Sequence, residues 1–382
     1  MTDTSLPRSA PQSAIVLGGG ILGCSTAVHL ARLGLTVTLV TEGPLAAGAS
    51  GRSLAWLNSA RKRSEPYHRL RMAGIERYRT LAAAHPGADW ITFAGGLTWD
   101  PAGAGNRIAE VWAHERAIGY EALLLPPETA AARVPGVAAE AITPPGAILN
   151  PGEGWVDLPS LIARLAAEIG TLGGRILTLD GPATPRADGP GLGLPDGTTL
   201  RADALVIACG AATPALAGAL GTPIGNGSPT GLVVETEPLD HPIRAVMNTP
   251  RVSLRPTPAG GLYMDSGWSE AEVIHHADGR IEIRPETVEG LLAEARRVLS
   301  PAPELTVRKI HTGPKPIPGD GEPVFGPLPS APGVWAAFSH SGATLGLIAG
   351  ELMADEIALG IEHPLLAAFR PARFAAPRQA AE

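Results

Sequence analysis

The sequence contains little of what holds small secreted proteins together. Only two of its 382 residues are cysteines, Cys24 and Cys209, and they stand far apart, outside any Cys-x-x-Cys pair. This spacing argues against a disulfide framework and a structural zinc site, and we expect no bound metal. Aromatic residues make up only 4% of the chain. A chain of this length nevertheless buries a substantial core without crosslinks, and its length favours two domains.

Basic runs and long apolar runs are equally scarce. The net charge is −7 and the longest basic run is 61–63, so nucleic-acid binding has no electrostatic support. No stretch approaches about 18 uninterrupted apolar residues, and we expect no membrane span. The first 13 residues lack the basic and apolar regions of a secretory signal. We therefore expect a cytoplasmic protein.

A β-α-β pattern stands near the start of the chain. Residues 14–17 form a short apolar strand, residues 21–33 have helical spacing that ends at Gly34, and residues 35–41 are β-branched. Such a unit has a right-handed crossover and two parallel strands. The pattern predicts a Rossmann-like α/β domain in a chain that is α+β overall.

The turn between the first strand and the helix fits the pattern G-x-G-x-x-G. Gly18 permits the tight turn, Gly20 lets the backbone approach a pyrophosphate, and Gly23 allows the helix to pack closely on the strand. Ile21 and Leu22 begin the helix, whose N–H groups and dipole favour an anion. The alternative, a glycine turn without a ligand, is disfavoured by the flanking strands and helix.

The second strand should end in an acidic residue that binds the ribose hydroxyls. Strict counting places Thr41 at that position and Glu42 directly after it. Neighbouring residues of a strand point to opposite faces, so the chain must bend for Glu42 to serve. Both residues remain candidates. The turn itself is common to sites for NAD and FAD.

The middle of the chain changes character. Strand-like runs at 231–235, 252–255 and 261–264 precede a helix at 286–299. They predict a second domain built on an antiparallel sheet. We assign a discontinuous cofactor domain to residues 1–85, 146–229 and 313–382, and a substrate domain to residues 86–145 and 230–312.

Four further segments are distinctive: Gly48-Ala49-Ser50-Gly51-Arg52-Ser53, Val206-Ile207-Ala208-Cys209-Gly210-Ala211, Gly313-Pro314-Lys315-Pro316 followed by 320–326, and His340-Ser341-Gly342-Ala343-Thr344-Leu345. In this order they resemble motifs of the D-amino-acid oxidase, glycine oxidase and sarcosine oxidase family. The resemblance covers nearly the whole chain and is specific for the family, though not for one substrate. It implies that the cofactor is FAD.

The resemblance also implies which residues contact FAD. Beyond the glycine turn, these are Ser50, Gly51, Arg52, Ser53, Cys209, Gly210, Gly313, His340, Ser341, Gly342, Ala343 and Thr344. The turn that contains His340 begins the last long helix, whose dipole would stabilise negative charge on the flavin, and His340 is also a catalytic candidate. In this family a His in the first loop or a Cys beside 313–316 would suggest a covalent flavin. Neither is present, so we expect non-covalent FAD.

Lys315 is the residue on which substrate recognition depends most. In the amino-acid oxidases of this family an Arg at this place binds the substrate carboxylate, whereas Lys is a single point charge. Lys315 is one of only three lysines and is a candidate for catalysis as well as substrate binding. The alternative is an exposed lysine in a proline-rich loop. Tyr263 and Trp56 are weaker substrate-binding candidates, because ordinary packing explains them equally well.

The predicted function is oxidation of a C–N bond, in an amino acid or a secondary amine, to an imine by hydride transfer to flavin. Oxygen or another electron acceptor would then reoxidise the flavin. One alternative is oxidation of a 2-hydroxy acid at a C–O bond. A second is a flavin-carrying subunit of a hetero-oligomeric dehydrogenase. The substrate, the choice between oxidase and dehydrogenase, and the oligomeric state remain open.

Overall fold

The computed structural model describes residues 11–374, which form two compact units. Unit 1 comprises the chain up to Gly48, Ile162–Ser228 and the chain from Pro316 on, whereas unit 2 comprises Ala49–Leu161 and Pro229–Lys315. Residues 49–85, 146–161, 229 and 313–315 thus belong to unit 2, although the sequence placed them with the cofactor domain. The cofactor and substrate roles of the two units stay predictions.

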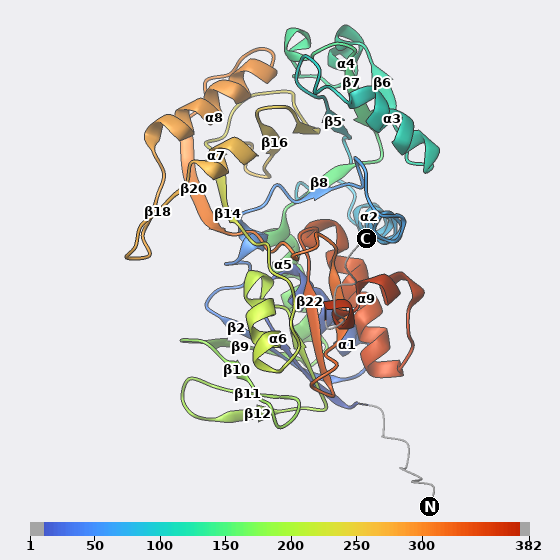
Figure 1. Ribbon diagram of the computed structural model, residues 1–382, viewed down its shortest axis with the longest axis vertical. Helices are drawn as coiled ribbons and strands as arrows, with labels where there is room; N and C mark the ends of the chain where they lie inside the picture. Colours follow the sequence, from blue (N-terminus) through green and yellow to red (C-terminus); the bar gives the residue numbers. More distant parts are fainter. Residues whose placement is uncertain (1–10, 375–382) are drawn as a thin grey trace, which may run out of the picture. The chain divides into compact units, whose positions relative to one another are not determined.

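Unit 1 is built on a six-stranded sheet (Figure 1). The strand order is β21-β22-β13-β1-β2-β9, and only the edge strand β21 runs antiparallel to its neighbour. The strands are β1 (Ser13–Leu17), β2 (Thr36–Glu42), β9 (Arg175–Leu179), β13 (Ala204–Ile207), β21 (Val324–Pro327) and β22 (Val334–Phe338). The carboxyl ends of the five parallel strands therefore share one edge of the sheet.

Helices α1 (Ile21–Arg32) and α9 (Gly342–Leu359) lie side by side in unit 1 (Figure 1). The Ser25 hydroxyl donates to the Leu347 carbonyl oxygen over 3.4 Å, and a Cβ on Gly350 would lie 2.7 Å from the Ser25 carbonyl carbon. The remaining elements of unit 1 are α6 (Thr213–Ala219), the 3-10 turns η3 (Gly210–Ala212), η4 (Pro364–Phe369) and η5 (Pro371–Phe374), and a small sheet of β10 (Thr184–Pro185), β11 (Gly191–Gly193) and β12 (Thr199–Arg201). Helix α5 (Leu158–Thr171) begins in unit 2 and continues in unit 1.

Unit 2 is built on an eight-stranded sheet in the order β20-β14-β17-β16-β15-β5-β7-β6. All neighbours are antiparallel except β15 and β5. The strands are β5 (Gly96–Thr98), β6 (Leu123–Leu125), β7 (Ala147–Asn150), β14 (Thr230–Thr236), β15 (Val246–Asn248), β16 (Ser253–Pro256), β17 (Leu262–Asp265) and β20 (Val307–Pro314). This sheet bears out the antiparallel pattern predicted for the middle of the chain.

Smaller elements complete unit 2. A three-stranded sheet has the order β3-β8-β4, and β18 and β19 form a separate hairpin. The elements are β3 (Trp56–Leu57), β4 (Ile91–Thr92), β8 (Gly154–Val156), β18 (Ile274–His275), β19 (Ile281–Glu282), α2 (Glu65–Ala84), α3 (Ile108–Ala117), α4 (Pro127–Arg133), α7 (Gly267–Ala271), α8 (Pro285–Val298), η1 (Ala49–Gly51) and η2 (Ala139–Ala141).

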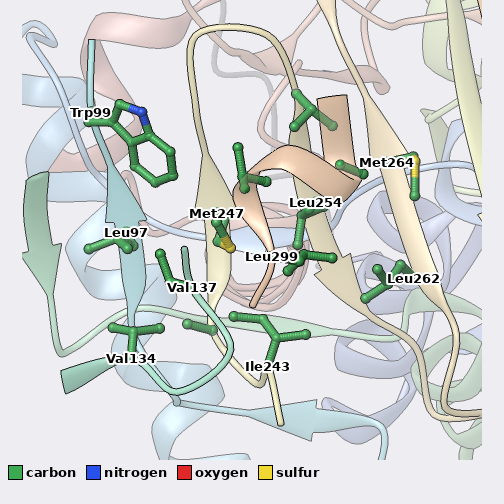
Figure 2. Close-up of a cluster of buried hydrophobic side chains, with 14 of the residues drawn as sticks. Leu97, Trp99, Val134, Val137, Ile243, Met247, Leu254, Leu262, Met264 and Leu299 are labelled. Carbon is green, nitrogen blue, oxygen red and sulfur yellow. The ribbon is translucent and has the colours of Figure 1, made fainter. Parts of the chain in front are cut away.

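One face of the eight-stranded sheet carries the core of unit 2. Figure 2 shows this cluster, in which Leu254, Leu262 and Met264 of the sheet pack with side chains that include Leu299. Because side chains alternate along a strand, Tyr263 and Asp265 lie on the opposite face. We call that opposite face the polar face. It carries Tyr263, one of the candidate substrate residues.

Two general features of the described chain bear on function. No helix in residues 11–374 combines the length and apolarity needed to cross a bilayer. Within the same residues, no group of three or more His, Cys, Asp or Glu side chains is placed to hold a metal ion.

Candidate functional site

The glycine turn of unit 1 is shaped by the strands around it. Gly18 has a φ of +124°, which side chains rarely allow, and a Cβ there would lie 2.3 Å from the carbonyl oxygen of Ala208 at the end of β13. A Cβ on Gly23 would lie 1.9 Å from the carbonyl oxygen of Gly18. Both close approaches involve backbone atoms, which cannot move aside. Glycine is therefore required at these two positions of the turn.

Two helix starts meet beside this turn. Gly20 is the N-cap of α1 in an extended conformation, and the first turn of the helix carries the uncharged side chains of Ile21 and Leu22. A Cβ on Gly342, the first residue of α9, would lie 3.7 Å from Cγ2 of Ile21. The positive ends of two long helix dipoles thus lie close together at the carboxyl edge of the sheet. This edge is suited to bind an anion.

The residues at this edge fit the pyrophosphate of FAD. A dinucleotide needs backbone without side chains close to its phosphates, and the turn at 18–23 supplies it at the start of α1. The second helix start, at Gly342, offers a further dipole for negative charge. Gly18, Gly20, Ile21, Leu22 and Gly23 would hold the pyrophosphate.

The two ribose candidates point to different surroundings. β2 continues through Glu42 without a bend, and the pairs Thr41–Thr178 and Glu42–Leu179 keep the parallel register with β9. Thr41 is buried, and a Cβ on Gly19 would lie 2.5 Å from its Oγ1. Glu42 is exposed at the end of the strand, and its charge raises the pKa of Cys209 beyond the effect of burial. Glu42 is therefore near the end of β13 and has its carboxylate available.

We expect Glu42→Ala to raise the Kd for FAD by about tenfold, the worth of a hydrogen bond to a charged group. Thr41→Val should change the Kd less, because the Thr41 hydroxyl already faces the backbone of Gly19. Fluorescence titration of the two apoproteins with FAD measures both values. The reverse order of effects would assign the ribose contact to Thr41.

The other residues predicted for the cofactor in unit 1 lie at the same carboxyl edge. The Cys209 thiol donates to the Leu17 carbonyl oxygen over 3.4 Å, and burial raises its pKa to about 12, so it is neutral. Gly210 has a φ of +55°. His340 is exposed, whereas the Ser341 N–H donates to the Ser339 hydroxyl over 3.1 Å. Ala343 and Thr344 follow in the first turn of α9.

The loop at 48–53 belongs almost wholly to unit 2. Ser50 and Gly51 form η1, and the Ser53 hydroxyl accepts the Ala55 N–H over 3.0 Å. The Arg52 guanidinium lies over Gly313 of β20, where a Cβ would be 2.6 Å from its Cζ. The structure thus brings together Arg52 and Gly313, two residues predicted from distant motifs to contact the same cofactor.

Arg255 links several of these residues, and sequence reasoning missed it. It is only 1% exposed and lies over the rings of Trp155 and Tyr263, with its Cζ 5.0 and 4.7 Å from the ring centroids. It donates to the Ser53 carbonyl oxygen over 3.4 Å and lies 3.7 Å from Asp157 Oδ1. Burial lowers its pKa to about 10, yet it stays charged at neutral pH. A lone Arg in a strand gives no signal of this role.

Trp56 lies beside a second buried group, Glu153. Trp56 lies in β3, which pairs with β8, and its indole and the Glu153 carboxyl group both lie against Gly96. Tyr120 donates to Glu153 Oε1 over 2.5 Å and accepts the Ser59 N–H over 2.9 Å. Burial raises the pKa of Glu153 to about 8, and the nearby charge of Glu115 adds to the rise. Glu153 is therefore largely protonated at neutral pH.

Lys315 is not a lysine exposed in a loop. It follows β20 directly, and its N–H donates to the Pro229 carbonyl oxygen over 2.8 Å. Its Nζ lies 3.4 Å from Asp265 Oδ2 and pairs with a carboxylate oxygen of Glu270. Burial lowers the pKa of Lys315, but the two carboxylates raise it further, so the net shift is upward and Lys315 is charged.

The sequence matches a protein family and is similar to several known proteins. The family described as DAO, FAD dependent oxidoreductase, matches residues 13–356. The tRNA 5-methylaminomethyl-2-thiouridine biosynthesis bifunctional protein MnmC of Chromohalobacter salexigens is 31% identical over 226 residues, which cover 57% of this chain and 31% of that protein. The uncharacterized oxidoreductase YurR of Bacillus subtilis is 36% identical over 73 residues, 18% of this chain and 19% of that protein. The chain spans about a third of the length of the first relative.

Solved structures share the fold along nearly the whole chain. Glycine oxidase from Geobacillus kaustophilus superposes with a TM-score of 0.80 at 23% identity, covering 95% of this chain and 98% of that one. L-proline dehydrogenase from P. horikoshii gives a TM-score of 0.79 at 18% identity, covering 96% and 98%. The predicted Rossmann-like fold with a second antiparallel sheet is confirmed.

Proposed function

Because the chain belongs to the FAD-dependent oxidoreductase family, we propose that it oxidises the C–N bond of an amine or amino acid to an imine. The amine loses two electrons and two protons, and the imine is then hydrolysed by water. FAD, when bound, supplies the two-electron acceptor. Oxygen or another acceptor takes the electrons in turn. The protein contributes binding, orientation and electrostatics.

The main support for FAD as the cofactor is that the starts of α1 and α9 lie together beside the glycine turn. Gly18 and Gly23 admit no side chain, and the first residue of α9 lies against Ile21 of α1. This combination suits a ligand that is anionic at its phosphates and gains negative charge on reduction. We further propose that the FAD is not covalently bound.

The substrate half rests on the relatives and on the polar face of unit 2. Two proteins with this fold are named glycine oxidase and L-proline dehydrogenase. Each name gives an amino acid as the substrate, and each amino acid contains a C–N bond. The polar face presents Tyr263 beside His311, with ring centroids 5.7 Å apart, and burial raises the pKa of Tyr263 to about 12. Tyr263 thus remains a neutral hydrogen-bonding group. We propose that this face recognises the substrate.

A small-molecule substrate is favoured over a nucleic acid. The matched relative MnmC is named for tRNA modification, but this chain spans about a third of it. The net charge of −7 and the lack of a long basic run leave RNA binding without electrostatic support.

Turnover with product analysis tests the reaction class. The purified protein is incubated with amines, amino acids and 2-hydroxy acids, with oxygen or a dye as acceptor. We expect a carbonyl product together with released ammonia or amine. A keto acid formed from a hydroxy acid, with amines inert, would assign C–O oxidation instead. Activity only with a co-purified partner would indicate a subunit of a hetero-oligomer.

A further inference from the structure

The side chain of Lys315 is fully engaged within unit 2. Its stem crosses Gly231 of β14, where a Cβ would lie 2.9 Å from Cε of the lysine, so glycine makes room for it. Its ammonium group lies between Asp265, at the end of β17, and Glu270 of α7. The three side chains are 14–27% exposed. They form a largely buried ion triad that joins the end of β20 to β17 and α7.

The triad carries an excess of negative charge. One ammonium group faces two carboxylates, so the sum is −1 when all three are ionised. Burial raises the pKa of Asp265 to about 6, which still leaves it mostly ionised at neutral pH. A third carboxylate placed here would raise the charge to −2 in a poorly hydrated site, and buried like charges are strongly unfavourable. A cationic or neutral group meets no such barrier.

Four other basic groups of unit 2 near this face are paired or enclosed, whereas Lys309, opposite Glu235, is exposed. Glu235 lies 3.0 Å from His311 and 3.5 Å from Arg308, and each contact is an ion pair when the partner is charged. Arg255 is enclosed by aromatic rings beside Asp157. Arg52 lies over Gly313 and comes from the predicted cofactor loop. The four basic groups are His311, Arg308, Arg255 and Arg52. None of them offers a compact positive charge, free of other partners, that could bind a substrate carboxylate beside Lys315.

From this geometry we infer that the polar face selects amines without a carboxylate next to the reacting carbon, and that Lys315 acts through its ion triad to exclude α-amino acids. The inference rests on the proposed C–N oxidation and names its substrate class. Lys315 is then a specificity-determining residue whose charge is paired with the carboxylates of Asp265 and Glu270. An arginine at this position would keep further donors free beyond two carboxylates, whereas lysine has a single charged centre.

Matched substrate pairs that differ only in the carboxylate test the inference. Flavin reduction is measured for pyrrolidine against proline, dimethylamine against sarcosine, and benzylamine against phenylglycine, using both enantiomers where they exist. We expect kcat/KM to favour the amine by about tenfold or more, the factor that corresponds to one poorly compensated charge. Preference for the amino acid would overturn the inference and leave C–N oxidation intact. Failure of every pair would overturn the proposed function itself.

The double variant Asp265→Asn/Glu270→Gln releases Lys315 from its triad while keeping the shapes of both side chains. Its ratio should move toward the amino acid by about tenfold, mainly through KM. Lys62→Gln, which removes an exposed lysine charge outside the eight-stranded sheet, should leave the ratio unchanged. Acetate gives a readout without turnover: it should perturb the flavin spectrum of the double variant and not that of the wild type. Equal acetate binding by both proteins would contradict the role of the triad.

Discussion

Gly23→Ala should greatly weaken FAD binding. The added methyl group would lie 1.9 Å from the Gly18 carbonyl oxygen and 3.6 Å from Cβ of Ala208, so α1 must move away from β1 and β13. That movement opens the turn whose backbone is proposed to hold the pyrophosphate. Loss of close helix–strand packing and of the phosphate site act together, and we expect the Kd for FAD to rise by more than about a hundredfold.

The control for this variant is Gly218→Ala in α6. A Cβ at Gly218 meets nothing within 4 Å, and alanine favours a helix over glycine. FAD content after purification and the Kd measured by titration of apoprotein compare the two variants. Circular dichroism checks that Gly23→Ala is folded. A folded, yellow Gly23→Ala protein with the wild-type Kd would exclude the turn as the cofactor site. Denaturing the wild type should release free FAD if the attachment is non-covalent.

Glu153 should make unit 2 less stable as the pH rises. Its pKa is 4.5 in an ordinary environment and about 8 in the folded chain, because burial disfavours the carboxylate. The folded state therefore holds one more proton than the unfolded state between these values. The stabilisation is complete below about pH 4.5 and is lost as the pH rises through about 8. The slope reaches at most about 1.4 kcal/mol per pH unit for one proton.

Glu153→Gln isolates this contribution, since glutamine resembles the protonated acid and carries no titrating group. Chemical unfolding at several pH values between 4.5 and 9 should show a shallower fall in stability for the variant than for the wild type. Glu304→Gln, at an exposed site of unit 2, is the matched control and should keep the wild-type slope. Identical slopes for wild type and Glu153→Gln would show that Glu153 is ionised in the folded protein.

Ionisation of Glu153 changes the surroundings of Trp56. When Glu153 is protonated, it accepts the hydrogen bond from Tyr120 and lies near the indole of Trp56 without a buried net charge. Neighbouring polar groups fix the following residues as well: Arg71 donates to the Asn58 carbonyl oxygen over 2.7 Å. The segment after the predicted FAD loop is thus fastened by buried polar side chains. We expect this segment to be the part of unit 2 most sensitive to high pH.

The sequence predicted those helices and strands that are determined by residues close together in the chain. The strands and helix at residues 13–42 follow from apolar runs, a glycine turn and Gly34, and the structure places every end within one residue of the expected limits. Helix α2 begins at Glu65, since Ser64 caps it and its hydroxyl accepts the Tyr67 N–H.

Strand β20 could not be predicted from its residues. It contains Gly313 and Pro314, which normally argue against a strand. They are tolerated because β20 is the edge strand, where a missing N–H costs no ladder hydrogen bond on the outer side. The parallel pairing of β15 with β5 joins residues about 150 positions apart. No local periodicity encodes such a partner.

Site residues could be predicted from the sequence only where they belong to a recognisable motif. The glycine turn and the start of α9 carry their own pattern, whereas the roles of Arg255, Glu153, Asp265 and Glu270 depend on which side chains surround them after folding. An isolated carboxylate in a sequence does not reveal that it will face a lysine from another strand. Lys315 shows the limit most clearly: its position was recognised, but its two partners were not.

Anaerobic mixing of the purified protein with amines tests C–N oxidation on the bound flavin. We expect a yellow protein whose flavin absorbance is lost on addition of an amine and returns when an acceptor is admitted, with imine-derived carbonyl product formed in the same amount as flavin reduced. A yellow protein that dithionite bleaches, but that no amine or amino acid reduces, would contradict C–N oxidation. A protein that binds no FAD at all would contradict the cofactor site as well.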